Sequence, residues 1–270
     1  MKTTFKLVRL LPLTAPLLLA GGLFWTAACT TMPDMDRPTF SMMSPSEEAR
    51  LGYAEFERIK QQRTISTNAE HNARVQRVAR RLVPHVPLAG AEWEFVVFDD
   101  PTPNAFALPG GKVGIHSGLF QIARNDAQLA AVLGHELGHV VARHAGERRT
   151  AQTAAALGGV ALGVGLGQRD MSDAQRAAIL GGYGAAATVG GVLPFSRRQE
   201  LEADQLGAIY MARAGYDPRE SVQVWINFMQ YRQAQGGARM PEFLSTHPLD
   251  ESRIANLEQF MPRAMAEMPG

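Results

Sequence analysis

The stretch that decides the fold is AQLAAVLGHELGHVVARH, residues 127–144. Asn125 and Asp126 precede it as capping residues, and no proline interrupts it. Its apolar residues recur at spacings of three and four, which is typical of a helix with a buried side. They are Leu129, Val132, Leu133, Leu137, Val140 and Val141. The pattern therefore predicts a buried helix.

Two histidines, His135 and His139, lie four residues apart in this helix. Because four residues make slightly more than one turn, both rings leave the same face and can bind one metal ion. Glu136 lies about 100° further around the helix, beside the metal but off the ligand axis. A general base for metal-bound water belongs there. The motif alone also fits three polar residues on a solvated helix face.

A second helix is predicted in SRRQELEADQLGAIYMARAGYDP, residues 196–218, with Ser196 as its cap and Gly215 at its end. Glu200 and Asp204 are four residues apart and share a face. Since catalytic zinc usually has three protein ligands, Glu200 is the candidate third ligand, and Asp204 can accept the free ring N–H of a ligating histidine. The spacing equally allows both acids to solvate a surface helix.

Together, the HELGH stretch and the Ser-Arg-x-x-Glu-x-x-Ala-Asp stretch resemble the gluzincin metallopeptidase family of the CAAX prenyl endopeptidases, HtpX and Oma. The likeness is strongest to its bacterial lipoprotein branch, which includes LoiP and the protease domain of BepA, and runs from Ser46 to the end of the chain. It implies one zinc ion bound by His135, His139 and Glu200. It also implies that Glu136 activates water and that Asp204 supports the site or donates a proton. The ligand set prefers zinc but accepts cobalt or manganese.

The first 28 residues read as an export signal, because Lys2, Lys6 and Arg9 precede an uncharged, leucine-rich run. Cys29 is the only cysteine, and its position after Ala27-Ala28 resembles a bacterial lipobox, although Thr26 stands where leucine is usual. This predicts a lipidated Cys29 and a protein anchored in the periplasm at the outer membrane. A cleaved soluble protein and a retained membrane anchor are the alternatives. Residues 29–45 are expected to form a flexible tether and residues 46–270 the metallopeptidase domain.

The net charge argues against a nucleic acid partner. Three of the 27 Lys and Arg residues lie in residues 1–28, so 24 remain against 26 Asp and Glu. A near-neutral chain without a basic, aromatic stripe does not indicate nucleic acid binding. The membrane contact would rest on lipid, and the oligomeric state is not indicated.

Amphipathic helices are predicted at residues 46–62 and 67–84, and strands at residues 93–98 and 112–115. In the family, a segment like Asn104, Ala105 and Phe106 belongs to a sheet edge where substrate adds as a strand. An unpaired edge offers N–H and C=O groups to any extended peptide. The alternative is a hairpin whose Phe106 is only a core residue. The fold class is thus α+β and mainly helical, a zincin-type domain with a small sheet beside the cleft.

Residues 151–168 and 177–195 are almost uncharged and rich in alanine and glycine. Small residues allow close helix packing, so a packed helical hairpin is the preferred interpretation. A mobile lid over the site and membrane insertion are the alternatives.

The C-terminal part contains a helix at residues 218–231 and a last helix at residues 250–260. Between them, His247 precedes a proline that restricts the loop. His247 could stabilise the oxyanion, close the open metal position, or be a structural residue, and Arg253 could orient this loop through a carboxylate.

These features predict a zinc-dependent endopeptidase of the bacterial cell envelope that cleaves extended or misfolded periplasmic and outer-membrane proteins. A chaperone-like factor for outer-membrane assembly, which holds chains rather than cutting them, is one alternative. A latent protease gated by His247 is the other.

Overall fold

The computed structural model describes residues 29–32, 34–35, 37–188, 193–235, 242–248 and 251–270. The expected signal peptide lies outside the described residues. The longer helices are α2 (Pro45–Gln62), α3 (Ala69–Leu82), α4 (Asp126–Val141), α5 (His144–Gly167), α6 (Asp173–Ala187), α7 (Leu193–Arg213), α8 (Glu220–Ala234) and α10 (Glu251–Met265). Shorter helical turns are η1 (Val83–His85), η2 (Ser117–Gln121) and α9 (Glu242–Thr246). The strands are β1 (Cys29–Met32), β2 (Arg37–Phe40), β3 (Glu94–Phe98), β4 (Ala105–Leu108) and β5 (Lys112–His116).

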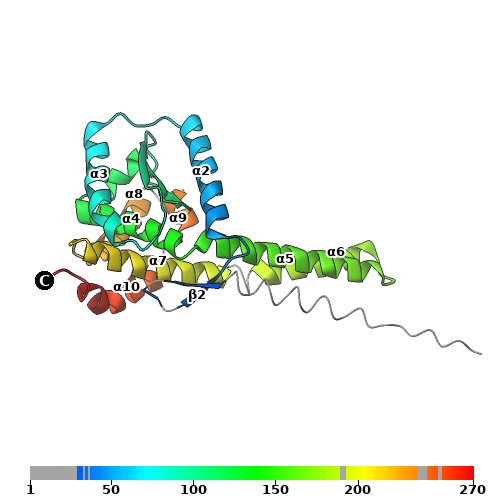
Figure 1. Cartoon of the computed structure of the whole chain (residues 1–270). Helices are drawn as coiled ribbons and strands as arrows, with labels where there is room; N and C mark the ends of the chain where they lie inside the picture. The colour runs from blue at the N-terminus through cyan, green and yellow to red at the C-terminus, as the bar shows by residue number, and fades with distance from the viewer. Residues whose placement is uncertain (1–28, 33, 36, 189–192, 236–241, 249–250) are drawn as a thin grey trace, which may run out of the picture.

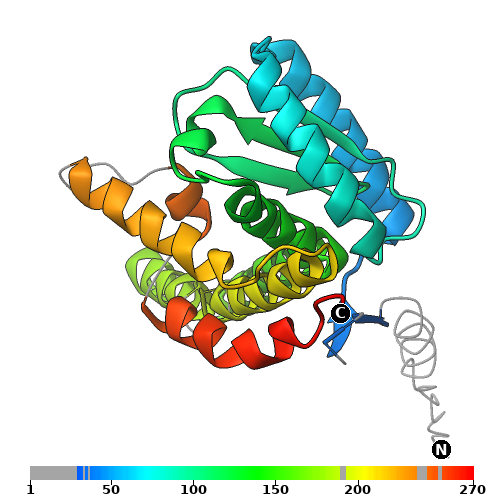
Figure 2. The same ribbon diagram turned by 90° about the vertical axis from the view of Figure 1, so that its left-hand side faces the viewer.

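A three-stranded sheet lies between α2 and α3 on one side and α4 on the other (Figure 2). β5 is central, parallel to β3 and antiparallel to β4. Among the described strands, β4 therefore has β5 as its one sheet neighbour and no strand on its outer edge. The α+β, mainly helical fold class is confirmed.

Helix α4 forms the centre of the core, with buried residues on every side. Asn125 caps it as predicted, because its side chain accepts the backbone N–H of Gln128. The caps of α2 and α3 are Ser44 and Asn68, so the sequence placed both helix starts one or two residues away from the real caps.

Helices α4 and α7 lie side by side (Figure 1). Glycines occupy positions where the two helices approach closely. A Cβ atom on Gly207 would lie 2.7 Å from the backbone nitrogen of His135. A Cβ atom on Gly138 would lie 3.0 Å from the carbonyl oxygen of Ala203. A Cβ atom at Gly207 would be closer than real Cβ atoms come, and one at Gly138 would be tight, so glycine permits the helix spacing that brings the α7 carboxylates to the histidines of α4. The sequence-based start of α7 at Ser196 is wrong, because the helix begins at Leu193 and already contains Ser196.

Residues 29–45, expected to form a flexible tether, instead contain a hairpin of paired β1 and β2. Charged residues hold this hairpin to the domain. Asp34 accepts two hydrogen bonds from Arg213 of α7 at 2.8 and 3.1 Å, and Arg37 lies among carboxylates of α5 and α7. The expectation fails because these ion pairs join residues more than a hundred positions apart, which composition does not reveal.

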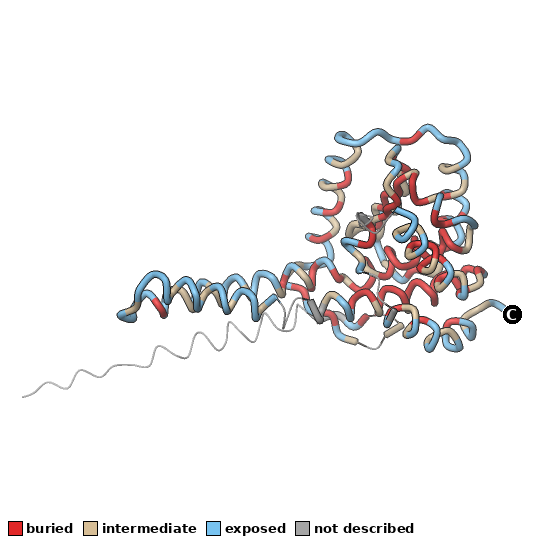
Figure 3. The backbone as a smooth tube through the Cα atoms, turned by 180° about the vertical axis from the view of Figure 1, so that it is seen from behind, coloured by how far each residue is buried: buried red, intermediate tan, exposed pale blue. Residues whose placement is uncertain are grey.

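Helices α5 and α6 pack along each other and extend from the body as a hairpin (Figures 1 and 3). This agrees with the packed-hairpin interpretation, although the second helix ends at Ala187 rather than at residue 195. By length and composition α5 could cross a membrane, and only 11% of its most apolar window is buried. Its apolar side chains Leu157, Val160 and Val164 are each about 60% exposed.

Helix α8 contributes apolar side chains to the core. Val224, Trp225 and Phe228 are buried, whereas Val222 and Met229 are only half-buried. Trp225 then forms part of the wall behind His135, with ring centroids 5.3 Å apart.

Candidate metal centre and catalytic site

The structure brings together the three ligands inferred from the sequence. The Nε2 atoms of His135 and His139 lie 3.1 Å apart. The Glu200 carboxylate on α7 lies 3.4 Å from His135 Nε2 through one oxygen and 3.5 Å from His139 Nε2 through the other. Both oxygens of one carboxylate therefore face the space between two imidazoles.

The outer nitrogen of each imidazole shows that this space fits a metal ion. His135 Nδ1 lies 2.9 Å from Asp204, a carboxylate that can only accept, so Nδ1 carries the proton and Nε2 a lone pair. His139 Nδ1 lies 2.8 Å from His144 Nδ1. Two imidazole nitrogens and a carboxylate thus face one point, where a cation can bind all three. Imidazole and carboxylate donors in a set of three suit zinc.

The charges around His135 favour one additional positive charge. Burial lowers the pKa of His135, but hydrogen bonds and charges from Asp204 and Glu200 outweigh it and raise the pKa to about 9. Burial would raise the pKa of Glu200. The nearby His139 and the hydrogen bonds between Glu200 and the histidines nevertheless hold the pKa of Glu200 well below its usual range. The two carboxylates therefore attract either a proton or a metal ion.

Asp204 is fixed from its other side by Arg253 of α10. The guanidinium donates Nε–H at 2.9 Å and Nη2–H at 2.8 Å to the two carboxylate oxygens. Burial would raise the pKa of Asp204, but Arg253 and His135 keep it below its usual range. Arg253 Nη1 also donates to the carbonyl oxygens of His247 and Pro248 at 3.4 and 3.2 Å. Arg253 therefore contacts the His247 loop directly at its carbonyl oxygens, and not through a carboxylate as expected.

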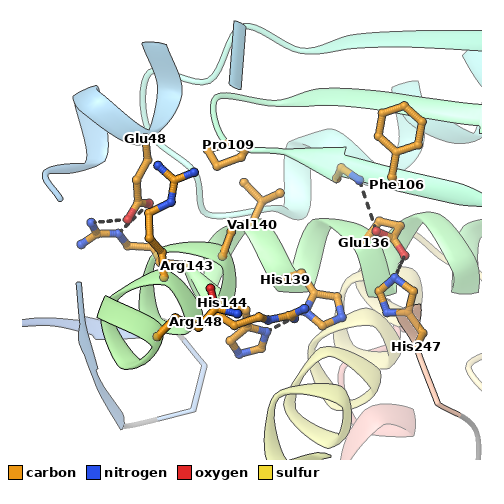
Figure 4. A pocket seen from close by; sticks show the side chains of 14 residues that line it. Glu48, Phe106, Pro109, Glu136, His139, Val140, Arg143, His144, Arg148 and His247 are labelled. Carbon is orange, nitrogen blue, oxygen red and sulfur yellow. Dashed lines mark hydrogen bonds and ion pairs between the residues drawn. The ribbon is translucent and has the colours of Figure 1, made fainter. Parts of the chain in front are cut away.

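Glu136 lies beside the ligand cluster with 3% of its surface exposed. Its Oε2 accepts the backbone N–H of Ala107 on β4 at 3.2 Å, while Oε1 lies 3.5 Å from His247 Nε2 and has no hydrogen-bond partner among the described residues (Figure 4). Burial raises the pKa of Glu136. A raised pKa makes this carboxylate a better proton acceptor, which suits a general base.

His247 contributes a fourth donor to the same cluster. Its Nδ1 lies 3.1 Å from Glu200 Oε2 and 3.2 Å from His135 Nε2. The ring stacks on Phe243 of α9, with centroids 4.6 Å apart. His247 therefore presents a fourth nitrogen to the space between His135, His139 and Glu200.

A cleft of about 300 Å³ opens beside the cluster (Figure 4). Glu136, His139 and His247 line one part, and Phe106 and Ala107 of β4 line another. Of the expected substrate-binding segment, Phe106 reaches the cleft. The Asn104 and Ala105 side chains are buried at 6% and 1% exposure, and the strand begins after Asn104.

Sequence reasoning missed the residues behind His139. His144 is buried and stands only five positions after His139, but a histidine at that spacing gave no distinct signal. Its Nε2 lies 3.1 Å from Glu202, which also binds Arg37. Arg37 lies far upstream on β2, so no local pattern could have assigned it to the site.

Two histidines and a glutamate that converge beside the buried carboxylate of Glu136 define a metalloendopeptidase of the zincin type. The profile described as peptidase family M48 matches residues 69–261. The chain belongs to this family.

Its relatives include mitochondrial and bacterial proteases. The mitochondrial metalloendopeptidase OMA1 of Saccharomyces cerevisiae is 34% identical over 265 residues, which cover 92% of this chain and 74% of the yeast protein. The beta-barrel assembly-enhancing protease of Escherichia coli is 32% identical over 235 residues, which cover 84% of this chain and 46% of that protein. The mitochondrial metalloendopeptidase OMA1 of Arabidopsis thaliana is 37% identical over 172 residues, covering 64% of this chain and 32% of the plant protein.

Proposed function

We propose that this chain is a zinc-dependent endopeptidase that cleaves extended or misfolded polypeptides of the bacterial cell envelope. The observation that carries the proposal is the convergence of His135, His139 and Glu200 on one point beside the buried Glu136. Zinc bound there would act as a Lewis acid that makes a water molecule acidic and polarises the scissile carbonyl.

The protein's own residues supply binding and proton transfer. The open edge of β4 offers backbone groups to an extended chain, which gives affinity with little dependence on sequence. Glu136 takes a proton from the attacking water and passes it to the leaving amine. Asp204 and Arg253 keep His135 in the tautomer that directs Nε2 into the site.

The proposed location is the periplasm, with Cys29 lipidated and the chain anchored at the outer membrane. Support comes from the export-like residues 1–28, from the position of Cys29, and from the similarity to a bacterial protease whose name refers to β-barrel assembly. Radiolabelled palmitate incorporation into wild type but not Cys29→Ala tests the anchor. Equal labelling of the two proteins would refute it.

The central experiment is Glu136→Gln, measured by casein cleavage and by zinc content. Loss of a positioned general base should lower the rate about 10²- to 10⁴-fold, while the three ligands still hold zinc. Asp126→Asn at the start of the same helix is the matched control and should retain activity. A Glu136→Gln enzyme that cleaves casein at the wild-type rate would remove the proposal.

Glu136→Gln also distinguishes a protease from a factor that only binds outer-membrane proteins. If the protein acts as an assembly factor that holds outer-membrane proteins, Glu136→Gln should still complement a deletion strain. The third possibility, a latent protease, is favoured by the position of His247 over the ligand cluster, and it is tested by removing that imidazole.

A further inference from the structure

The outer nitrogen of His139 begins a chain of hydrogen bonds that leads out of the metal site. His139 Nδ1 lies 2.8 Å from His144 Nδ1, and His144 Nε2 lies 3.1 Å from Glu202 Oε2. Arg37 Nη2 donates to that same oxygen at 2.7 Å. Four side chains from β2, α4, α5 and α7 thus form one connected path.

The acceptor at the end of this path fixes every proton along it. The Glu202 carboxylate can only accept, so His144 Nε2 carries the donated hydrogen. The other nitrogen of a neutral His144 must then accept from His139 Nδ1. His139 is left with its lone pair on Nε2, the atom that faces His135 and Glu200. The tautomer of His135 is fixed in a similar way, because its Nδ1 donates directly to the Asp204 carboxylate.

Arg37 is the cation that stabilises the end of the path. Its Nη1 donates to Glu147 at 2.7 Å and its Nη2 to Glu202 at 2.7 Å, and both carboxylates are at least 90% buried. Gln199 adds a hydrogen bond to Glu147 at 3.2 Å, while Arg198 reaches the outer oxygen of Glu202 at 3.5 Å from an exposed position. Without Arg37, two buried carboxylates would lose the guanidinium that joins them, which is costly.

We propose that Arg37 and His144 are positioning residues of the metal site, so that the contacts of Arg37 with Glu147 and Glu202, and not the docking of the β1–β2 hairpin as such, set the affinity of the enzyme for zinc. This inference rests on the proposed function. It assigns a role to the segment that immediately follows Cys29. Loss of the Arg37 contacts would loosen the His144–Glu202 pair that holds His139 Nδ1.

The test compares zinc dissociation constants of purified full-length variants, measured by competition with a chromophoric chelator at pH 7.5. Arg37→Met keeps the length of the side chain and removes its charge. Because loss of a partner behind a metal-binding histidine typically costs 10- to 100-fold in affinity, we expect Arg37→Met to weaken zinc binding about 10-fold. Arg37→Lys keeps the charge but lacks the two guanidinium nitrogens that donate to Glu147 and Glu202. Its zinc affinity should fall between those of Arg37→Met and wild type.

A matched control separates this path from general docking of the hairpin. Asp34→Asn removes the ion pair with Arg213 on the same hairpin, and asparagine tolerates the left-handed backbone of Asp34, with φ of 67°. It should lower the melting temperature of the zinc-free protein yet keep zinc affinity within twofold of wild type. If Asp34→Asn and Arg37→Met weaken zinc binding equally, zinc affinity depends on docking of the hairpin and not on the Arg37 contact. That result would overturn the proposal.

His144→Phe tests the middle of the path, with zinc affinity and the visible spectrum of the cobalt-substituted protein as readouts. We expect about a 10- to 100-fold loss of affinity and altered cobalt bands. If His144→Phe does not fold, the zinc affinity of Arg37→Met alone tests the inference. Wild-type affinity in a folded Arg37→Met would refute the inference while leaving the endopeptidase intact, whereas a wild type that binds no zinc would refute the proposed function itself.

Discussion

Replacing His247 by alanine should increase the peptidase rate, because this imidazole fills the fourth position of the ligand cluster. The ring is held by a contact of 3.1 Å with the charged Glu200 and by stacking on Phe243. A hydrogen bond to a charged group contributes about 1.5–3 kcal/mol. That free energy corresponds to a closed state favoured about 10- to 150-fold.

If the closed state blocks substrate, His247→Ala should raise kcat/KM on casein about 10-fold or more at pH 7.5. Zinc content should stay at one ion per chain, because three ligands remain. His85→Ala, a histidine outside the ligand cluster, is the control and should match wild type.

Two results would refute this reasoning. An unchanged rate would mean that His247 does not obstruct the site. A rate lowered by 100-fold or more, with zinc retained, would mean that the imidazole takes part in catalysis, for which stabilisation of the oxyanion is the available role.

Three further predictions concern stability and metal binding. Gly207→Ala should lower the free energy of unfolding by about 1–3 kcal/mol and weaken zinc binding, because its Cβ would lie 2.7 Å from the His135 backbone nitrogen; Gly165→Ala, in open space on α5, should not. Asp126→Asn should cost about 1 kcal/mol in urea unfolding at pH 7, since hydrogen bonds from Arg77 lower the pKa of Asp126. A lowered folded pKa stabilises above the unfolded value of 3.8, so the difference from wild type should shrink as the pH falls below 3.8, and a constant difference would contradict this. Removing zinc with a chelator should lower the melting temperature of wild type, and addition of zinc should restore it; equal melting temperatures with and without zinc would count against a metal bound to the folded state.

The local features of the site were predictable because they depend on neighbours in sequence. The 3.6-residue period places His135 and His139 on one face whatever the rest of the chain does. Asn125 caps α4 through a side chain three residues from its partner. These statements need only backbone geometry and hydrogen bonds inside one helix.

The third ligand was predictable only through resemblance to a family. Spacing places Glu200 and Asp204 on one helix face but cannot say what that face meets. Their approach to the histidines depends on contact between α4 and α7 at Gly207, where packing leaves no room for a side chain.

The path from Arg37 to His139, by contrast, was decided by tertiary structure alone. Arg37 lies in a stretch whose composition indicates a tether, and its partners Glu147 and Glu202 lie 110 and 165 positions away. Periodicity and capping report which backbone forms locally. They carry no information about which distant charge a buried carboxylate will find, because that choice is made by the packing of whole helices.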